Sequence, residues 1–115
     1  MKNKTFCFDI DGVICRTHKN HYSSAKPIKK SIEIINKLYL NNYIIIFTSR
    51  YMGRNKDNIK KAKSQGYSLT LKQLKKWGLN FHELRFGKPS FDFFLDDKNV
   101  FFKKKWHNYF KKKFI

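Results

Sequence analysis

Acidic residues are scarce in this chain of 115 residues, which has 8 Asp and Glu against 26 Lys and Arg and a formal net charge of +18. Cysteine is scarcer still, with two residues and no Cys/His spacing typical of a zinc site, which excludes a disulfide framework and a zinc module. No apolar run approaches the about 18 residues that span a membrane, and no charged-then-apolar leader opens the sequence. The length predicts one domain over residues 1–115, and the default location expected is the cytoplasm.

Half of these scarce acids stand directly after apolar runs that are typical of β-strands. Asp9 and Asp11 follow the first such run, and Asp96 and Asp97 follow the run Phe91–Leu95. Asp9 and Asp11 are two residues apart, so on an extended chain their side chains point the same way at the end of the strand. Like charges held this close repel each other unless a cation lies between them. The pattern therefore favours a metal or catalytic site over a turn or a helix cap.

The order of apolar patterns predicts an α/β fold. A helix is expected from Pro27 to the pair Asn41–Asn42, because Ile residues and Leu38 recur on one face, and Tyr43–Phe47 is typical of a strand buried on both faces. A strand, a helix and a second apolar strand make a βαβ unit with a parallel sheet. The expected architecture is three-layer and Rossmann-like, a small parallel sheet flanked by helices, with residues 12–26 as a loop or flap over the site.

The second half of the chain is expected to add shorter elements. A capping-box pattern at Thr70–Gln73 indicates that a helix starts there and runs from Leu71 to Trp77, after a loop and a separate short basic helix within residues 51–67. Short strands are expected at Leu84–Phe86 and Phe91–Leu95. The tail from Lys98 is expected to form a helix with its aromatic face against the sheet.

Several polar groups are expected to meet at one edge, because the carboxyl ends of parallel strands lie together. Most of them directly follow an expected strand, and Lys88 lies in the turn before the last one. In chain order they are Asp9, Asp11, Thr48, Ser49, Lys88, Asp96 and Asp97. Carboxylates suit Mg²⁺, which prefers oxygen ligands, and a hydroxyl and an ammonium would neutralise phosphoryl oxygens. The combination indicates chemistry on a phosphoryl group.

Four segments, Phe8–Val13, Phe47–Arg50, Gly87–Pro89 and Phe94–Asp97, resemble in order and context the four motifs of the haloacid dehalogenase (HAD) superfamily of phosphatases and phosphotransferases. The resemblance covers nearly the whole chain. It implies a HAD-like fold without a cap domain, because the segments where caps are inserted are short. An open site would accept large substrates or receive a lid from a neighbouring subunit of a homo-oligomer.

The resemblance also implies roles for the two acids of the first motif and for the residues that meet the phosphate. Asp9 looks like the nucleophile that forms an aspartyl-phosphate, and Asp11 looks like the general acid, with its backbone carbonyl on the metal. Thr48 would bind the transferring phosphoryl group. Lys88 would hold Asp9 and the phosphate in place.

The remaining motif residues complete the expected site. Asp96, with Asp97 through water, would complete the Mg²⁺ site together with Asp9 and Asp11. Ser49 and Arg50 are further candidates for phosphate contacts, and a surface arginine is the alternative for Arg50. Neither cysteine is given a catalytic role.

Three functions remain open at this point. The first is a Mg²⁺-dependent phosphatase that hydrolyses a phosphomonoester of a small metabolite, such as a sugar phosphate, through an aspartyl-phosphate. The alternatives are a polynucleotide-end phosphatase and a non-catalytic, basic nucleic-acid-binding module on a HAD fold. The charge of +18 would attract nucleic acid, but AT-rich coding sequence also produces Lys-rich chains, so this partner is not favoured. No membrane partner is expected.

Overall fold

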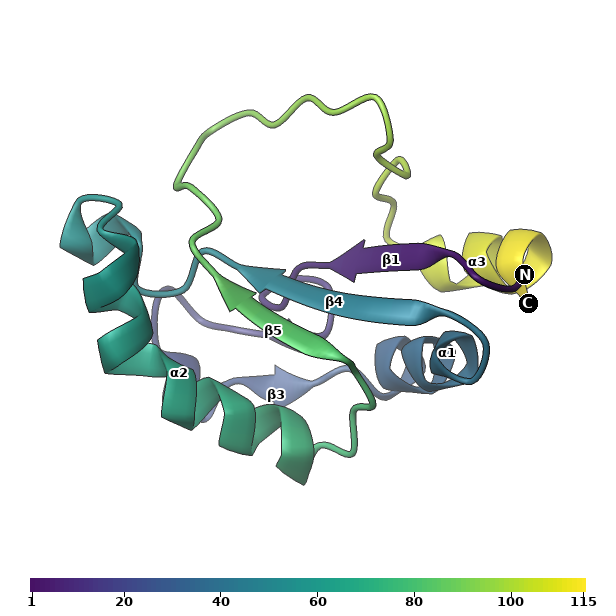
Figure 1. Ribbon diagram of the computed structural model, residues 1–115, viewed down its shortest axis with the longest axis horizontal. Helices are drawn as coiled ribbons and strands as arrows, with labels where there is room; N and C mark the ends of the chain where they lie inside the picture. The colour runs from purple at the N-terminus through teal and green to yellow at the C-terminus, as the bar shows by residue number, and fades with distance from the viewer.

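The computed structural model describes residues 1–115 as an α/β protein with a small parallel sheet flanked by helices, as expected (Figure 1). The sheet has the order β1-β4-β5, with β1 at Thr5–Phe8, β4 at Tyr43–Thr48 and β5 at Glu83–Phe86. Both pairings are parallel, so the carboxyl ends of the three strands share one edge. The predicted β1, β4 and β5 are confirmed, because their β-branched and aromatic residues suit a pleated, buried surface.

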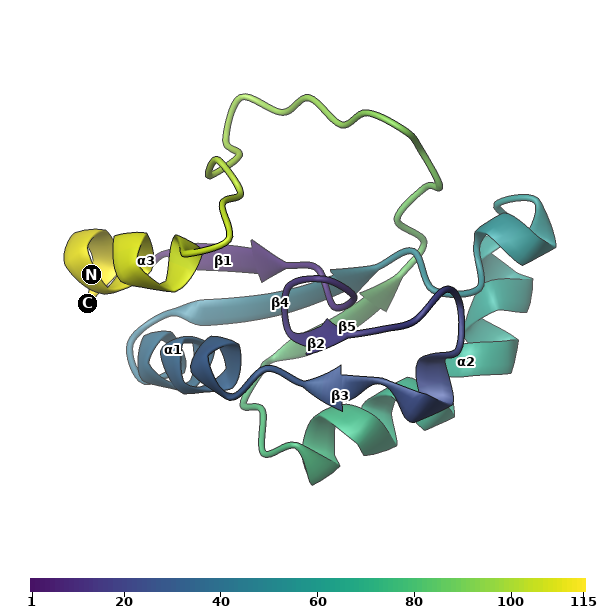
Figure 2. The same ribbon diagram turned by 180° about the vertical axis from the view of Figure 1, so that it is seen from behind.

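The helices are α1 (Lys29–Tyr39), α2 (Ile59–Lys76) and α3 (Trp106–Phe114), with short 3₁₀ turns at Tyr22–Ser24 and Gly53–Asn55. Helix α1 packs against β4, and α2 packs against β5. Both lie on the same side of the sheet when it is seen from the front and from behind (Figures 1 and 2). One face of the sheet is therefore covered by these helices, and the other face is not. Successive side chains of each strand point to these two faces in turn.

The helix-covered face forms the core, and the opposite face lies under a loop. Phe8, Ile46 and Phe86 are buried on the first face. On the second face Cys7 is exposed and Phe47 is half-buried, and the chain from 87 to 105 arches over them (Figure 1). The third layer that the sequence led us to expect is thus a loop in this structure and contains no helix.

The expected aromatic tail helix is present as α3, but it begins at Trp106 and not at Lys98. Trp106 and Phe110 are buried, and the ring of Phe110 packs at a tilt against Phe8 and Phe6, with centroid distances of 5.9 and 6.3 Å. Helix α3 also packs against α1. The N-terminal ammonium of Met1 donates a hydrogen bond of 3.0 Å to the carbonyl of Phe114, so the two termini lie side by side, away from the carboxyl edge (Figure 1).

The other two helices also differ from the expectation. Pro27 belongs to a short strand, and α1 begins at Lys29. The two helices expected between residues 51 and 77 are one continuous helix, α2, capped by the side chain of Asn58, which accepts the backbone N–H of Lys61 at 3.0 Å. Thr70 lies inside α2 and is fully buried, so the capping-box interpretation was wrong. Packing of one side of the helix on β5 overrides the local capping pattern.

The strand expected at Phe91–Leu95 is not formed, and that prediction was wrong for this structure. Residues 87–105 contain no helix or strand, and Phe93 and Leu95 are 96% and 100% exposed. No backbone N–H from 91 to 95 donates a hydrogen bond within the protein. An apolar run becomes a strand only when a neighbouring edge accepts its hydrogen bonds, and β1 pairs only with β4 here.

Residues 12–26 form the expected flap. It contains β2 (Cys15–Arg16) and β3 (Lys26–Pro27), which pair antiparallel. The chain leaves β1 through Gly12, whose φ of 88° is a conformation that favours glycine, and whose N–H donates to the carbonyl of Cys15 at 2.8 Å. None of the helices has the length and apolar character needed to cross a membrane.

Candidate active site

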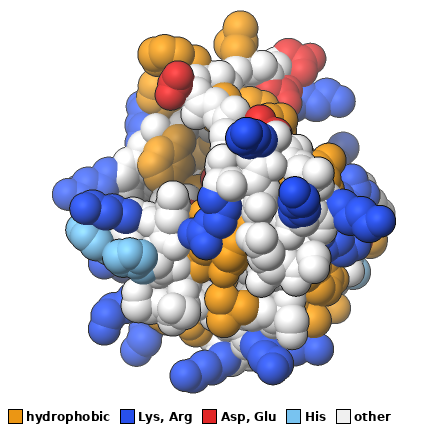
Figure 3. Space-filling view, turned by 90° about the vertical axis from the view of Figure 1, so that its left-hand side faces the viewer, with side chains coloured by type: hydrophobic (Ala, Val, Ile, Leu, Met, Phe, Trp, Pro, Cys, Tyr) orange, Lys and Arg blue, Asp and Glu red, His pale blue; other side chains and the backbone are white.

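The candidate residues of the first three motifs gather at the carboxyl edge of the sheet. Asp9 follows β1 directly, Ser49 and Arg50 follow β4, and Lys88 comes shortly after β5. Figure 3 faces this edge and shows mostly Lys, Arg and uncharged atoms, with acidic atoms only towards the top of the view. The edge is therefore a basic surface that surrounds a few carboxylates.

Asp9 forms an ion pair with Lys88, whose Nζ lies 3.3 Å from Oδ2 of Asp9. The other oxygen, Oδ1, accepts the backbone N–H of Ile10 at 2.8 Å. Burial raises the pKa of Asp9 above its usual value, although the charge of Lys88 and these hydrogen bonds act in the opposite direction. With Oδ1 held by the backbone, Oδ2 is the oxygen of Asp9 that is directed to the lysine.

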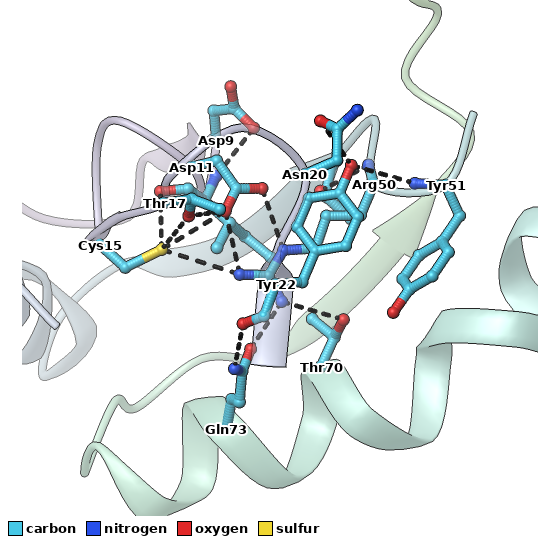
Figure 4. Close-up of polar contacts among 12 residues, drawn as sticks. Asp9, Asp11, Cys15, Thr17, Asn20, Tyr22, Arg50, Tyr51, Thr70 and Gln73 are labelled. Carbon is cyan, nitrogen blue, oxygen red and sulfur yellow. Dashed lines mark hydrogen bonds and ion pairs between the residues drawn. The ribbon is translucent and has the colours of Figure 1, made fainter. Parts of the chain in front are cut away.

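Asp11 is held by Arg50 in a bidentate ion pair. Nε of Arg50 lies 2.9 Å from Oδ2 of Asp11, and one of its terminal nitrogens lies 3.0 Å from Oδ1 (Figure 4). The hydroxyl of Thr17 and, at 3.5 Å, the thiol of Cys15 also donate to Oδ1. Four donor groups therefore fix this carboxylate from the strand end and the flap, in the planar geometry that Arg and a carboxylate favour.

Arg50 is a buried side chain, 1% exposed, and so is not the surface arginine that was the alternative. Its second terminal nitrogen donates to Thr70 at 3.3 Å and to Gln73 at 2.6 Å, and the first also contacts the sulfur of Cys15 at 3.7 Å. With the two contacts to Asp11, these five contacts match the five N–H donors of a guanidinium. Burial lowers the pKa of Arg50, but the bonds and charge of Asp11 outweigh it, so the net shift is upward.

The same network joins the flap to α2. The amide nitrogen of Gln73 donates to the carbonyl of Tyr22 at 2.6 Å, and the guanidinium of Arg50 lies 4.8 Å from the centre of the Tyr22 ring. The backbone N–H of Tyr51 donates to the Tyr22 hydroxyl at 3.4 Å. Figure 4 shows the ring of Tyr22 in front of the guanidinium. The flap is thus anchored on the residue that holds Asp11.

The two hydroxyl residues of the second motif differ in burial. Thr48 is fully buried, and its Oγ1 accepts the backbone N–H of Arg50 at 3.0 Å. Ser49 is half-buried. In this structure, the Thr48 hydroxyl stabilises the turn after β4.

Asp96 and Asp97 are exposed residues of the loop 87–105. Asp96 lines a cavity of about 670 Å³ between this loop and the open face of the sheet, which Asp9 and Lys88 also line. No three His, Cys, Asp or Glu side chains are close enough to hold a metal ion together. The four carboxylates expected to bind Mg²⁺ are therefore not assembled into one ligand set in this arrangement.

The cysteines have the properties of structural thiols. Burial raises the pKa of Cys15 to about 11, with Thr17 acting in the opposite direction. A thiol with so high a pKa stays protonated at neutral pH and is a poor nucleophile. Cys7 lies in β1 on the open face of the sheet, and burial also raises its pKa.

Sequence reasoning missed four residues of the network, Thr17, Tyr22, Thr70 and Gln73. Thr70 and Gln73 are three residues apart, the spacing that puts two side chains on the same helix face. That signal was present in the sequence, but it was interpreted as a capping box. The flap residues carry no comparable pattern.

No protein-family model and no curated protein matches this sequence. Among solved structures, the crystal structure of an MCSG target from Vibrio cholerae is similar, with a TM-score of 0.79 and 24% sequence identity. The similarity covers 95% of this chain and 98% of that chain. At this identity the similarity shows the fold, an α/β arrangement with a small parallel sheet.

Proposed function

We propose that this protein is a phosphatase of the HAD superfamily that hydrolyses a phosphomonoester of a small metabolite, such as a sugar phosphate. The observation that carries the proposal is the ion pair between Asp9 and Lys88 at the carboxyl edge of the sheet, 3.3 Å long and at the wall of a cavity of about 670 Å³. A second carboxylate, Asp11, lies two residues further on. A paired nucleophile and proton carrier at such an edge suit phosphoryl transfer.

The proposed reaction has two steps. In the first, Oδ2 of Asp9 attacks phosphorus, an O–P bond forms, and the bond from phosphorus to the leaving oxygen breaks as that oxygen takes a proton from Asp11. In the second, water attacks the phosphorus of the aspartyl-phosphate, Asp11 accepts the proton of the water, and the bond to Asp9 breaks to release phosphate. Splitting the displacement in this way replaces one difficult step by two easier ones.

The phosphoryl oxygens need positive or hydrogen-bonding partners in the transition state. We assign this role to Lys88 and to the hydroxyls of Thr48 and Ser49, with Ser49 the more accessible of the two. Arg50, the other phosphate candidate, is occupied by protein acceptors in this structure.

Mg²⁺ remains part of the proposal through the motif resemblance and the chemistry of carboxylate oxygens. Bound there, it would neutralise charge on the phosphoryl group. Because the carboxylates do not form one set in this structure, none of the steps above is assigned to the ion. The test is phosphate release with Mg²⁺ and with EDTA, and loss of activity in EDTA that Mg²⁺ restores would support the metal.

The basic surface favours one second candidate, a phosphatase that acts on polynucleotide ends. Figure 3 shows Lys and Arg side chains around the carboxyl edge, and such a surface attracts polyanions at long range. This candidate uses the same residues and differs only in the substrate. Comparing sugar phosphates with 3′- and 5′-phosphorylated oligonucleotides distinguishes the two.

The decisive variant is Asp9→Asn, which keeps the shape of the side chain and removes the nucleophile. We expect it to abolish phosphate release from every substrate, while circular dichroism shows an unchanged fold. Asp92→Asn, an exposed acid of the loop, is the matched control and should behave as wild type. Full activity in Asp9→Asn would refute the nucleophile. A wild type without activity, whose oligonucleotide affinity falls steeply with salt, would favour the binding module.

A further inference from the structure

We propose that the cavity beside Asp9 binds the nucleobase of the substrate, so that the phosphomonoester hydrolysed is a nucleoside monophosphate. This inference rests on the proposed phosphatase function and narrows its substrate class, because a nucleoside monophosphate is a sugar phosphate that carries a flat aromatic ring. The geometry that carries it is a cavity of about 670 Å³ that has the proposed nucleophile at one wall and hydrophobic, mostly aromatic, side chains over most of its lining.

The walls of this cavity are rich in aromatic rings. Thirteen of its twenty lining residues are hydrophobic, and most of these are Phe. Phe47 comes from β4, and Phe94, Phe101 and Phe102 come from the loop 87–105. The three loop residues are at least half exposed, so much of each ring has no protein partner. Apolar surface that is exposed around a concave space of about 300–1,000 Å³ is typical of a ligand site.

One lysine joins the proposed nucleophile to the aromatic wall. Nζ of Lys88 lies 3.3 Å from Oδ2 of Asp9 and 5.5 Å from the centre of the Phe94 ring. It also lies 5.4 Å from the centre of the Phe91 ring, which is stacked on Phe94 at a centroid distance of 5.0 Å. A phosphoryl group held by Asp9 and Lys88 therefore has an aromatic side chain beside it, and its leaving group lies next to the cavity.

Few hydrogen-bonding side chains face the cavity. Apart from Asp9 and Lys88, the polar residues that line it are Thr5, Arg85, Asp96, Lys98 and Asn99. The guanidinium of Arg85 is already bonded to the carboxylate of Glu83. A sugar without a base would bring several hydroxyls into this apolar space, and each one left unpaired there costs free energy. A nucleobase has two flat faces, which stack on aromatic rings without this cost.

The size and the cover of the cavity favour a single nucleotide over a polynucleotide. Its volume of about 670 Å³ is that of a pocket for one small ligand. The chain from 87 to 105 arches over the open face of the sheet between β5 and α3 (Figure 1), so the loop and the sheet form two walls of the cavity. A base that enters between these walls can contact both, and we therefore assign the cavity to the base of a monomer.

Binding is tested with a matched pair of ligands, adenosine 5′-monophosphate and ribose 5-phosphate, which share the phosphate and the sugar and differ in the base. Cys7 lines the cavity and is exposed, whereas Cys15 is buried, so alkylation of Cys7 by iodoacetamide reports whether the cavity is occupied. The protein used is Asp9→Asn, which should leave both ligands intact. We expect the nucleotide to slow the alkylation, followed by intact mass, and ribose 5-phosphate at the same concentration to leave its rate unchanged.

Kinetics on wild type should show the same dependence on the base. We expect kcat/KM for the nucleotide to exceed that for ribose 5-phosphate by roughly tenfold or more, the contribution of one base–aromatic stack. Phe94→Ala and Phe101→Ala should each reduce this ratio, mainly by raising KM for the nucleotide, and circular dichroism checks that both fold. Phe93→Ala is the matched control. Its ring is on the same loop, 96% exposed and absent from the cavity wall, and it should keep the wild-type ratio.

The outcomes separate the two proposals. An active wild type with equal kcat/KM for the two substrates, and no protection of Cys7 by the nucleotide, would overturn the nucleobase site and leave the phosphatase standing. Protection that depends on the base and is lost in Phe94→Ala, without phosphate release from any substrate, would support the site and overturn the phosphatase. A preference of roughly tenfold for a 5′-phosphorylated oligonucleotide over the mononucleotide would overturn the assignment to a monomer.

Discussion

The ammonium of Lys88 lies 3.3 Å from Oδ2 of Asp9, and it is the charge that most opposes the effect of burial on that carboxyl. Burial raises the pKa of Asp9 and the lysine lowers it. The two residues lie far apart in sequence, and the parallel sheet brings them together. The balance between burial and this one charge determines over which pH range Asp9 is ionised.

Replacing Lys88 by Met should therefore move the acid limb of the pH–activity profile to higher pH. Without the lysine, the pKa of Asp9 rises further, and the nucleophile is protonated at a pH where the wild-type carboxylate is still ionised. The measurement is kcat/KM as a function of pH. Lys98→Met, on the same loop and at the same cavity, should leave the limb in place. An unmoved limb in Lys88→Met would contradict the pairing.

Asp9→Asn should make the protein more resistant to heat at neutral pH, although it removes the activity. The folded-state pKa of Asp9 is raised mainly by burial, so the stability that the wild type has at low pH is lost as the pH rises through that value. The amide does not ionise and avoids this loss. We expect a higher Tm than wild type at pH 7, and a difference that disappears below about pH 4, the usual value for an unfolded Asp. Equal Tm values at both pH values would refute the idea.

Gly66→Ala should not give the stabilisation that this change usually gives in a helix, about 1 kcal/mol. Gly66 is inside α2, and a Cβ there would fall 2.3 Å from two ring carbons of Tyr51 and 3.2 Å from Phe86. The ring of Tyr51 must move, and with it the backbone that binds the hydroxyl of Tyr22. Urea unfolding should show a loss of stability. Ser64→Ala, exposed on the same helix, should show a small gain.

Backbone amides of residues 91–95 should exchange hydrogen rapidly, because none of them donates a hydrogen bond within the protein. Amides of β4, which pairs on both sides, should exchange slowly, close to the rate of global unfolding. Hydrogen exchange followed by mass spectrometry checks both. Protection of 91–95 as strong as that of β4 would show that the strand expected from the sequence does form.

The strands and helices that were predicted correctly are those whose apolar sequence pattern alone shows how they are buried. The run Tyr43–Phe47 is apolar throughout, which suits a central strand with neighbours on both sides, and the structure puts it in the centre of the sheet. The run Phe91–Leu95 has the same kind of composition. It forms no strand here because a strand also depends on an accepting edge, and a sequence does not show which edge is available.

Helix α2 shows the opposite error, because two helices were predicted where the structure has one. Ala62, Gly66, Thr70 and Leu74 recur every four residues and are all buried, which is the signature of one helix lying on a sheet. The capping-box pattern at Thr70–Gln73 suggested that one helix ended before it and another began there. Packing on β5 decides the outcome, because most of the stability of a helix in a protein comes from its buried face.

The candidate site was predictable in part, because the sequence marks the ends of the strands. The positions of Asp9, Asp11, Arg50 and Lys88 follow from strand ends, which the sequence marks, and the structure brings them into two ion pairs. Which cation pairs with which acid depends on side-chain direction and burial, which no spacing encodes. Arg50 was a candidate for a phosphate contact, with a surface arginine as the alternative; it is buried and pairs with Asp11.

The hydrogen bond between the ammonium of Met1 and the carbonyl of Phe114 puts both ends of the chain at the side of the sheet opposite the carboxyl edge (Figure 1). An affinity tag or fusion partner attached at either end would therefore leave the basic edge unobstructed. Immobilisation through such a tag would present that edge outward to the solution. The kinetic and oligonucleotide-binding measurements described above can thus be made on tagged protein, captured on a surface through either end.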